Sequence, residues 1–394
     1  MTDNQPQAAY EVEADDAGEM TPEQLAESKR KGQIELACDI VDRVIDLVFL
    51  AVMAFVLGGP AGWLMQWVPG ADWPETIRLA SLMLLLIVLG SIISFPLAFY
   101  GGFVLEHQFG LSRQTIGRWL KQYAKSHALG MTFSLLLICG LYWVIWLTGA
   151  WWWIIAAVAF FLITIVMGQL APVLILPLFN KIEPLEPGER TDELNRRMAQ
   201  LAEGTGLTIQ GVYGINMSAD TVKANAMLAG LGRTRRVIMG DNLLKKFTLD
   251  EIEVIFAHEV GHHVYRHIWK SIVMAGLYSL VAFWLCDRLF NTWVGSHGQS
   301  LNYHDFPVYT LPMMLFFIAV FSQLTEPLKN MVTRFFERQC DRYALDRTHL
   351  NEAYISAFTK LAKLNKDDPE PHPVEVFLFH SHPPIAERLA MATE

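Results

Sequence analysis

Long runs of apolar residues, separated by short polar segments, dominate the pattern along this chain. A run of about 20 apolar residues is long enough for an α-helix to cross the hydrocarbon core of a membrane. The pattern therefore predicts a multi-pass α-helical membrane protein with about six spans. The spans are expected at residues 44–65, 79–105, two within 128–180, 268–286 and 306–325.

Two of these runs contain residues that are expected to kink or interrupt a helix. Pro96 lies inside the second run and is expected to kink its helix. Residues 128–180 contain no charged residue and are too long for one crossing. Thr148-Gly149-Ala150, followed by three tryptophans, is expected to form a tight turn at an aromatic membrane interface. That turn would divide the run into the third and fourth spans.

Lysine and arginine residues are unevenly divided between the two sets of loops. The loops on one side hold Lys29, Arg30, Lys31, Arg113, Arg118, Lys121, Lys125, Lys329, Arg334 and Arg338. The opposite loops hold Arg78 and Arg288. Cationic loops stay on the cytoplasmic side of a membrane. Both termini and residues 181–267 are therefore expected to be cytoplasmic.

The polar segments outside the spans predict the remaining domains. Residues 1–30 are expected to form an acidic disordered tail, 181–267 a soluble catalytic module and 327–394 the C-terminal part of that module. Inside the module, the pattern predicts a helix over 191–205 and a small β-sheet. The sheet is expected to contain a strand over 207–213 and two strands within 223–240 that are joined by a turn at Leu231-Gly232-Arg233-Thr234.

Composition supports the membrane class and narrows the chemistry. Hydrophobic residues make up 52% of the chain and charged residues 18%, which is atypical of a soluble protein. The net charge of −9 comes largely from the N-terminal acids, and no basic stretch indicates a nucleic-acid partner. Four cysteines lie far apart without a paired CxxC spacing, so neither disulfides nor a thiolate zinc site is expected.

The candidate chemistry lies in His258-Glu259-Val260-Gly261-His262, an HExxH pattern. Thr248 and Glu251 form a capping box that opens a helix just before it. Residues four apart lie on one face of a helix, so the two imidazoles can bind a single zinc ion. Glu259 is then expected to act as the general base toward a water molecule.

A third metal ligand is expected from the segment after the last span. Glu337 would complete a His2Glu set and leave a fourth position open. Asp341 follows one helical turn later and would accept a hydrogen bond from a ligand histidine, which fixes the tautomer of that ring. Alone, both acids would be ordinary surface residues; the upstream HExxH pattern favours the metal-site interpretation.

Several motifs occur in one order along the chain and carry a resemblance to a known family. They are Glu106 to Thr115, Pro177-Leu178-Phe179-Asn180-Lys181 with Pro184-Leu185, Asn225-Ala226, His258 to His262 with His267, Thr333-Arg334 through Asp341 and Ala344, and Ser381-His382-Pro383-Pro384 with Glu387-Arg388-Leu389. Together they resemble the type-1 CAAX prenyl endopeptidase family of membrane zinc proteases, over about residues 95 to 390.

The resemblance implies one zinc ion per chain, a zincin-like catalytic module and a peptide or protein substrate that is prenylated in this family. It also implies that Asn225, Ala226 and His382 contact the substrate. Asn225 and Ala226 lie in a predicted strand that can pair with an extended peptide. His382 can donate a hydrogen bond to the oxyanion that forms on the cleaved carbonyl group. By residue type alone, Asn225 and His382 would be ordinary loop residues.

Some positions depart from the family pattern. His263 replaces an aromatic residue, Thr333 a serine and Cys340 an alanine, while His380 precedes the Ser381-His382 pair. One N-terminal span is missing relative to eukaryotic members, and no dibasic retention signal ends the chain. These two features predict a bacterial inner-membrane protein, with membrane lipid around it and an oligomeric state that the sequence leaves open.

Two other functions fit parts of the pattern. A membrane quality-control protease of the HtpX type would use the same chemistry on damaged proteins, although that type is shorter and lacks the Phe109-Gly110 and Phe179-Asn180-Lys181 signatures. A transporter or scaffold that binds ions would need ionisable groups near the middle of its spans. Here His258, Glu259 and Glu337 lie near predicted helix ends, which disfavours the transporter.

Overall fold

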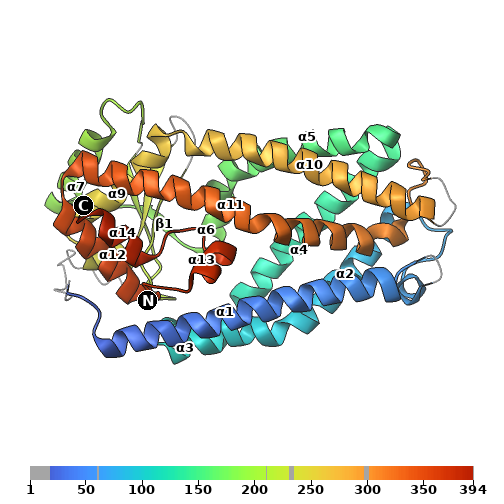
Figure 1. Ribbon diagram of the computed structural model, residues 1–394, viewed down its shortest axis with the longest axis horizontal. Helices are drawn as coiled ribbons and strands as arrows, with labels where there is room; N and C mark the ends of the chain where they lie inside the picture. Colours follow the sequence, from blue (N-terminus) through green and yellow to red (C-terminus); the bar gives the residue numbers. More distant parts are fainter. Residues whose placement is uncertain (1–17, 60–61, 210, 230–234, 297–300, 394) are drawn as a thin grey trace, which may run out of the picture.

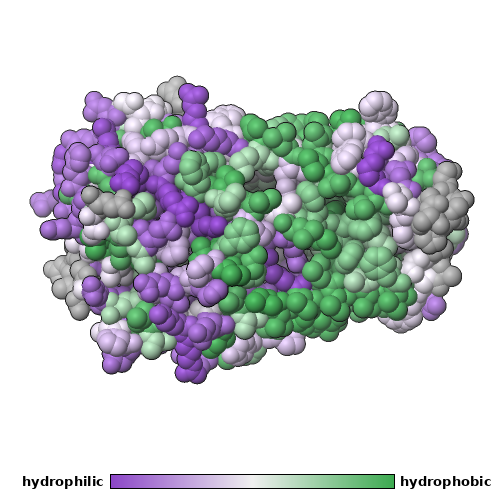
Figure 2. Space-filling view, in the orientation of Figure 1, coloured by the Kyte–Doolittle hydropathy of each residue, from purple (hydrophilic) through white to green (hydrophobic). Residues whose placement is uncertain are grey.

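The computed structural model describes residues 18–59, 62–209, 211–229, 235–296 and 301–393. A bundle of long helices extends from a smaller mixed module that contains the β-sheet and both ends of the described chain (Figure 1). The surface of the bundle carries a broad apolar band, whereas the module at the other end is mainly polar (Figure 2). A continuous apolar band of this kind is typical of a surface that faces lipid.

The long helices of the bundle are α1 (Pro22–Ala51), α2 (Glu75–Phe99), α4 (Ile116–Thr148), α5 (Trp152–Leu170), α10 (His267–Ser296) and α11 (Leu311–Thr348). Four stretches of the described chain are long and apolar enough to cross a membrane: Glu75–Gln108, Ile116–Leu170, His267–Trp293 and Val308–Thr348. The second of these comprises α4 and α5, which pack against each other. The predicted spans after the first therefore coincide with apolar helices of the bundle.

The structure shows the turn predicted between α4 and α5 and places Pro96 inside α2. Gly149 ends α4 with a φ of 57°, a left-handed conformation that favours glycine, and a short 3-10 turn over Gly149–Trp151 leads into α5. Pro96 lies inside α2, and the helix widens into a π-helix over Tyr100–Leu105. The expected turn between the third and fourth spans is confirmed.

The N-terminal region corrects two expectations. Helix α1 already begins at Pro22, because Thr21 and Gln24 form a capping box, so residues 22–30 are not a disordered tail. Residues 1–17 lie outside the described part of the chain. The first span was expected over 44–65, but the regular helix ends at Ala51, a π-helical turn follows over Val52–Val56, and α1 carries charged side chains such as Arg43. Arg43 forms an ion pair with Glu326 of α11, which joins α1 to the bundle.

The mixed module is built on a four-stranded sheet of order β1-β2-β4-β3. Its strands are β1 (Ile182–Pro184), β2 (Val212–Ile215), β3 (Ala226–Ala229) and β4 (Arg236–Gly240). β2 and β4 are parallel, and the other two pairs are antiparallel. A small sheet was predicted, and β3 and β4 lie within the expected residues 223–240. The strand expected over 207–213 begins only at Val212, and β1 was not predicted. The turn predicted at residues 231–234 lies outside the described residues. β3 stands at the end of the sheet and pairs with β4 alone among the described strands.

Helices cover the sheet and enclose one hydrophobic core. They are α7 (Glu189–Ala202), α8 (Asp241–Lys246), α9 (Leu249–Val264), α12 (Asn351–Asn365) and α14 (Ile385–Met391). Helix α13 (Pro373–Phe379) packs against α11 instead. Phe247, Val254, Phe256 and Tyr354 are buried at the centre of this core. Two short helices, α3 (Glu106–Gln108) and α6 (Leu176–Phe179), lie where the chain passes between the bundle and the module.

The connections between module and bundle differ from each other. The chain was expected to run as one helix from Leu249 into the fifth span, but α9 ends at Val264 and α10 begins at His267. Arg266, with a left-handed φ of 56°, breaks the helix between them. Helix α11 is unbroken over 38 residues, so it links the bundle rigidly to Glu337.

Candidate metal centre

Helix α9 carries His258 and Glu259, which line one cavity, and His262, which faces Glu337 beside it. Thr248 accepts a hydrogen bond from the backbone of Glu251, and the backbone of Thr248 donates one to the Glu251 carboxylate, so the expected capping box starts the helix. The apolar residues 254–257 are buried in the core, which orients the helix so that its ligand face meets α11.

Gly261 allows α9 and α11 to approach closely. A Cβ atom at this position would lie 3.1 Å from the Cα of Cys340 and 3.2 Å from its Sγ. Only glycine leaves this space free, so the backbones of the two helices can cross without a side chain between them. The close crossing brings the acids of α11 to the histidines of α9.

Glu337 faces both histidines. Its Oε2 lies 3.3 Å from Nε2 of His258, and its Oε1 lies 3.3 Å from Nε2 of His262. Glu337 and His258 are buried, with 4% and 7% of their surfaces exposed. Two imidazole nitrogens and a carboxylate thus converge on one point, as the donor set of a catalytic zinc site does.

A second row of contacts orients the histidines from behind. Nδ1 of His258 bonds to Oδ1 of Asp341 at 2.8 Å. Asp341 is completely buried and also accepts a hydrogen bond from Nε of Arg388 at 3.0 Å. For the other histidine, Nδ1 of His262 lies 3.1 Å from Nδ1 of His267. Nε2 of His267 in turn bonds to Oε1 of Gln339 at 3.0 Å. Partners of this type fix the tautomer of a metal-binding imidazole.

The electrostatic surroundings favour a positive charge at His258 when no metal is bound. Burial opposes that charge, but the hydrogen bond and charge of Asp341, together with Glu337, outweigh burial and raise the pKa of His258 to about 9. A divalent cation at Nε2 would replace this proton and satisfy the same two carboxylates. The residues present therefore fit a bound metal ion.

Cys340 is the alternative third ligand, since its Sγ lies near His258 and His262. The sulfur is fully buried and lies 3.5 Å from Nδ1 of His267, on the side of His262 that faces away from Glu337. The two Nε2 atoms instead face the carboxylate of Glu337. The geometry favours the carboxylate over the thiol.

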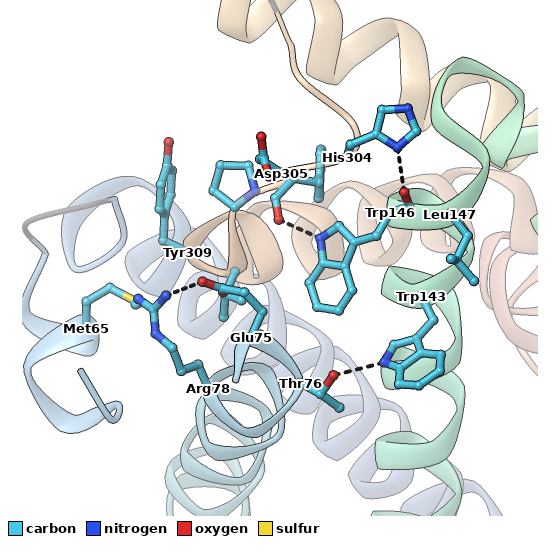
Figure 3. Close-up of a pocket in the computed structure, with 13 residues that line it drawn as sticks. Met65, Glu75, Thr76, Arg78, Trp143, Trp146, Leu147, His304, Asp305 and Tyr309 are labelled. Atoms are coloured by element: carbon cyan, nitrogen blue, oxygen red, sulfur yellow. Dashed lines mark hydrogen bonds and ion pairs between the residues drawn. The ribbon is translucent and has the colours of Figure 1, made fainter. Parts of the chain in front are cut away.

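His258 and Glu337 open into a cavity of about 650 Å³. Glu259, Asn225, Ala226 and His382 line the same cavity. The cavity thus brings together the candidate residues except His262, which faces Glu337 beside it, and Asp341, which lies behind His258. A cavity of similar size, about 670 Å³, lies at the opposite end of the bundle and is lined by Trp143, Trp146 and His304 (Figure 3). Volume alone does not distinguish the two; the convergent donor atoms do.

His382 differs from the expectation in its contacts. Its Nδ1 bonds to Oε2 of Glu337 at 2.9 Å, so it supports the third candidate ligand, and its side chain remains 63% exposed. The sequence alone assigned no role to Arg388, His267 or Gln339, although all three lie within the motifs that carry the family resemblance. Their roles depend on contacts between distant elements, which no local pattern reveals.

Two family models together match nearly the whole chain. Residues 7–181 match the model described as the CAAX prenyl protease N-terminal domain, with five membrane helices. Over the matched residues that the structure describes, the long helices are α1, α2, α4 and α5. Residues 188–394, which are more than half of the chain, match the model of peptidase family M48.

Individual relatives agree with these matches. The uncharacterized metalloprotease YhfN of Bacillus subtilis is 27% identical over 391 residues, covering 98% of this chain and 89% of that protein. CAAX prenyl protease 1 of Saccharomyces cerevisiae is 29% identical over 327 residues, covering 77% of this chain and 70% of that protein. The crystal structure of S. mikatae Ste24p has the same fold, with a TM-score of 0.75 and 21% identity over 95% of this chain and 89% of that chain.

These matches contradict the interpretation of the chain as a transporter or scaffold. The first model matches the membrane helices, and the second matches the part of the chain that contains the HExxH helix. The chain belongs to peptidase family M48 and is an integral membrane metalloendopeptidase.

Proposed function

We propose that the chain holds one zinc ion through His258, His262 and Glu337 and hydrolyses peptide bonds with Glu259 as general base. The observation that carries this proposal is the position of both Nε2 atoms 3.3 Å from the two oxygens of Glu337, which lines the same cavity as Glu259. When bound there, zinc supplies a Lewis acid that polarises a carbonyl group and acidifies a water molecule.

Side chains of the protein transfer the proton, orient the two histidines and stabilise the oxyanion. Glu259 takes the proton of the attacking water and passes it to the leaving amine. Asp341 and Arg388 hold His258 in one tautomer, and His267 does the same for His262. Nε2 of His382 has no protein partner among the described residues and is available to donate to the oxyanion of the cleaved carbonyl.

The substrate is expected to lie along β3 as an extra strand. Asn225 and Ala226 line the cavity, and β3 is the last strand in the sheet order, so its outer edge offers backbone donors and acceptors. A peptide held this way is extended, which exposes the scissile bond to Glu259. This arrangement assigns the backbone role to Ala226 of β3. The backbone oxygen of Asn225 already accepts a hydrogen bond from Gly240, so Asn225 would contact the substrate through its side chain.

Metal content and turnover of four variants test the site. The wild type is expected to carry about one zinc ion, and His258→Ala and Glu337→Ala to lose it. Glu259→Gln should keep the metal and lose about a hundred- to ten-thousand-fold in turnover. Cys340→Ala is the matched control, because it removes the alternative ligand from the same helix. Loss of zinc from Cys340→Ala but not from Glu337→Ala would replace Glu337 in the ligand set.

A prenylated substrate is the finer part of the proposal. The names of the relatives from yeast and other eukaryotes, CAAX prenyl protease 1, support it, and so does the location of the cavity at the end of the apolar bundle. Each lipid CH2 group buried between the helices would contribute about 0.8 kcal/mol. Removing the lipid from a test peptide should therefore reduce kcat/KM more than changing a polar side chain two residues from the cut.

The quality-control protease of the HtpX type is the competing function. It predicts equal cleavage of lipidated and unlipidated peptides and digestion of unfolded soluble proteins. Both outcomes use the same zinc chemistry, so this assay distinguishes the substrates without depending on the ligand assignment.

We also propose a bacterial inner-membrane location with the catalytic module and both termini in the cytoplasm. The lysine and arginine distribution and the near full-length similarity to a Bacillus subtilis protein support it. Reporters fused after Met65, Gly149 and Gly298 should report the periplasm, and those after Lys125, Gly240 and Glu394 the cytoplasm. A periplasmic signal after Gly240 would reverse the orientation.

A further inference from the structure

A second cavity of the mixed module lies where the catalytic helix meets the bundle. Its volume is about 650 Å³, and it is separate from the metal centre. Its walls are the turn after α7, the junction between α9 and α10, and the last turns of α11. The residues that line it include Glu203, His263, Arg266, Trp269 and Arg347.

The cavity is cationic. Arg266 and Arg347 line it, and within the described residues no ion pair joins either of them to a carboxylate. The single acid in the lining is Glu203, whose backbone oxygen, rather than its carboxylate, accepts a hydrogen bond from Arg347 at 3.4 Å. The cavity of Figure 3 offers a contrast, because its only arginine, Arg78, is paired with Glu75.

A third arginine lies behind the wall. Arg235 is buried, with 6% of its surface exposed, contacts Nδ1 of the lining residue His263 and leaves its Nε without a partner among the described residues. No ion pair to a carboxylate is present for it within the described part of the chain either. A buried cation without a counter-charge is costly, so an anion in the neighbouring cavity would stabilise this region.

The backbone of Arg266 adopts an unusual conformation. Its φ of 56° lies in the left-handed region, where a non-glycine residue costs about 1 kcal/mol and where helix ends favour glycine. Arg266 is therefore strained in a conformation that glycine would adopt without cost. His349 and Lys366 adopt the same conformation at the ends of α11 and α12, so the conformation sets the direction of the chain at Arg266 and does not by itself assign a role to the side chain.

An apolar path leads from the cavity along the outside of α10. Trp269, Val273 and Leu277 are 57%, 60% and 60% exposed and lie four residues apart, on one face of the helix. Val281 and Trp284, one and two helical turns farther along α10, are exposed as well. A cationic cavity at the end of a lipid-facing stripe matches a ligand with an anionic head and apolar chains.

We propose that this cavity binds the headgroup of an anionic phospholipid whose acyl chains lie along the exposed face of α10. Arg266 and Arg347 contact the phosphate group, and Trp269 packs beside the upper part of the chains. The bound lipid ties the C-terminal end of the catalytic helix α9 to the membrane surface. This site is independent of the zinc ligands and of the substrate proposed above.

Lipid binding to the zinc-loaded full-length protein in detergent tests the proposal. Native mass spectrometry would measure retention of phosphatidylglycerol against phosphatidylcholine. We expect phosphatidylglycerol to be preferred, and Arg266→Gly and Arg347→Gln each to weaken its binding about fivefold, since a cation near a membrane surface contributes on that scale. Glu203→Gln removes the acid of the cavity and should strengthen binding.

The choice of Arg266→Gly separates loss of the ligand from loss of the fold. Glycine relieves the left-handed strain, so the melting temperature should stay the same or rise while lipid binding falls. Lys121→Gln is the matched control, because Lys121 is an exposed cation at the start of α4, outside the cavity. It should retain wild-type binding.

Three results would overturn the proposal. The first is wild-type retention of phosphatidylglycerol by Arg266→Gly. The second is an equal loss in Lys121→Gln, which would indicate attraction by general surface charge. The third is displacement of the lipid by inorganic phosphate at the same concentration, which would identify a site for a free anion.

Discussion

Nδ1 of His258 and Oδ1 of Asp341 are joined by a hydrogen bond of 2.8 Å between residues that lie 83 positions apart in the chain. Asp341 has no exposed surface, and Arg388 holds it from the far side. In the proposed metal centre, the carboxylate would therefore act through the ring of His258. We accordingly propose Asp341 as a positioning residue rather than a group that touches substrate.

Replacing Asp341 with asparagine is expected to weaken zinc binding about 10- to 100-fold. Asparagine keeps the size of the side chain but removes the charge that stabilises one tautomer of His258, and it leaves Arg388 buried without its counter-ion. Competition with a chelator would measure the affinity. A structural role alone would lower the melting temperature and leave the zinc affinity of the folded protein unchanged.

His267 is expected to position His262 in the same way. Its ring stacks on Phe336, with ring centroids 4.2 Å apart, and its Nδ1 accepts from His262. His267→Phe should preserve the stacking, remove the acceptor and reduce zinc affinity about tenfold or more. Gln339→Leu, which removes only the outer partner of His267, should have a smaller effect. Equal zinc affinity in His267→Phe and the wild type would contradict this role.

The metal affinity should depend on pH through His258. In the metal-free protein the folded-state pKa is raised from 6.5 to about 9, so the stability that protonated His258 contributes is complete below about pH 6.5 and disappears as the pH rises through 9. Zinc must displace this proton. Apparent affinity should therefore fall about tenfold for each pH unit below 9.

Zinc titrations between pH 6.5 and 9 would measure that slope. Asp341→Asn provides the control, because loss of the carboxylate charge should move the steep region to lower pH. A slope that is unchanged in this variant would show that another group releases the proton.

Gly261→Ala tests the close crossing of α9 and α11. The added methyl group would lie 3.1 Å from the Cα of Cys340, so the helices must separate, and we expect a loss of about 1–3 kcal/mol in the free energy of unfolding. Cys340→Ala in the same chain should recover part of this loss, since it removes the sulfur atom but leaves the backbone of residue 340 equally close. Full recovery would mean that only the sulfur limits the approach.

Local patterns were sufficient where the deciding interactions are local. The apolar runs predicted the later membrane helices, because a lipid environment requires an unbroken stretch of apolar side chains. The spacing of His258 and His262 placed both rings on one face of a helix, since that relationship follows from helix geometry alone. Thr248 and Glu251 identified the start of the same helix, because a capping box involves only its first turn.

Interactions between distant segments escaped these patterns. The N-terminal acids suggested a disordered tail, yet α1 begins at Pro22 and its Arg43 pairs with Glu326 of α11. The helix from Leu249 was expected to continue into the fifth span, yet the left-handed Arg266 separates α9 from α10. The start of α1 does carry a local signal, the capping box of Thr21 and Gln24, whereas the pairing of Arg43 with Glu326 depends on the packing of α1 against α11.

The sequence by itself determined that His258 and His262 lie on one face of a helix, with Glu259 beside them, and that apolar helices precede and follow the module that holds them. Only the tertiary structure decided that Glu337 meets both histidines, that Asp341 and Arg388 orient His258, and that His267 orients His262. The reason is physical. Helix periodicity sets the direction of side chains within one segment, whereas the approach of α9 to α11 depends on the space left at Gly261 and on the shared hydrophobic core.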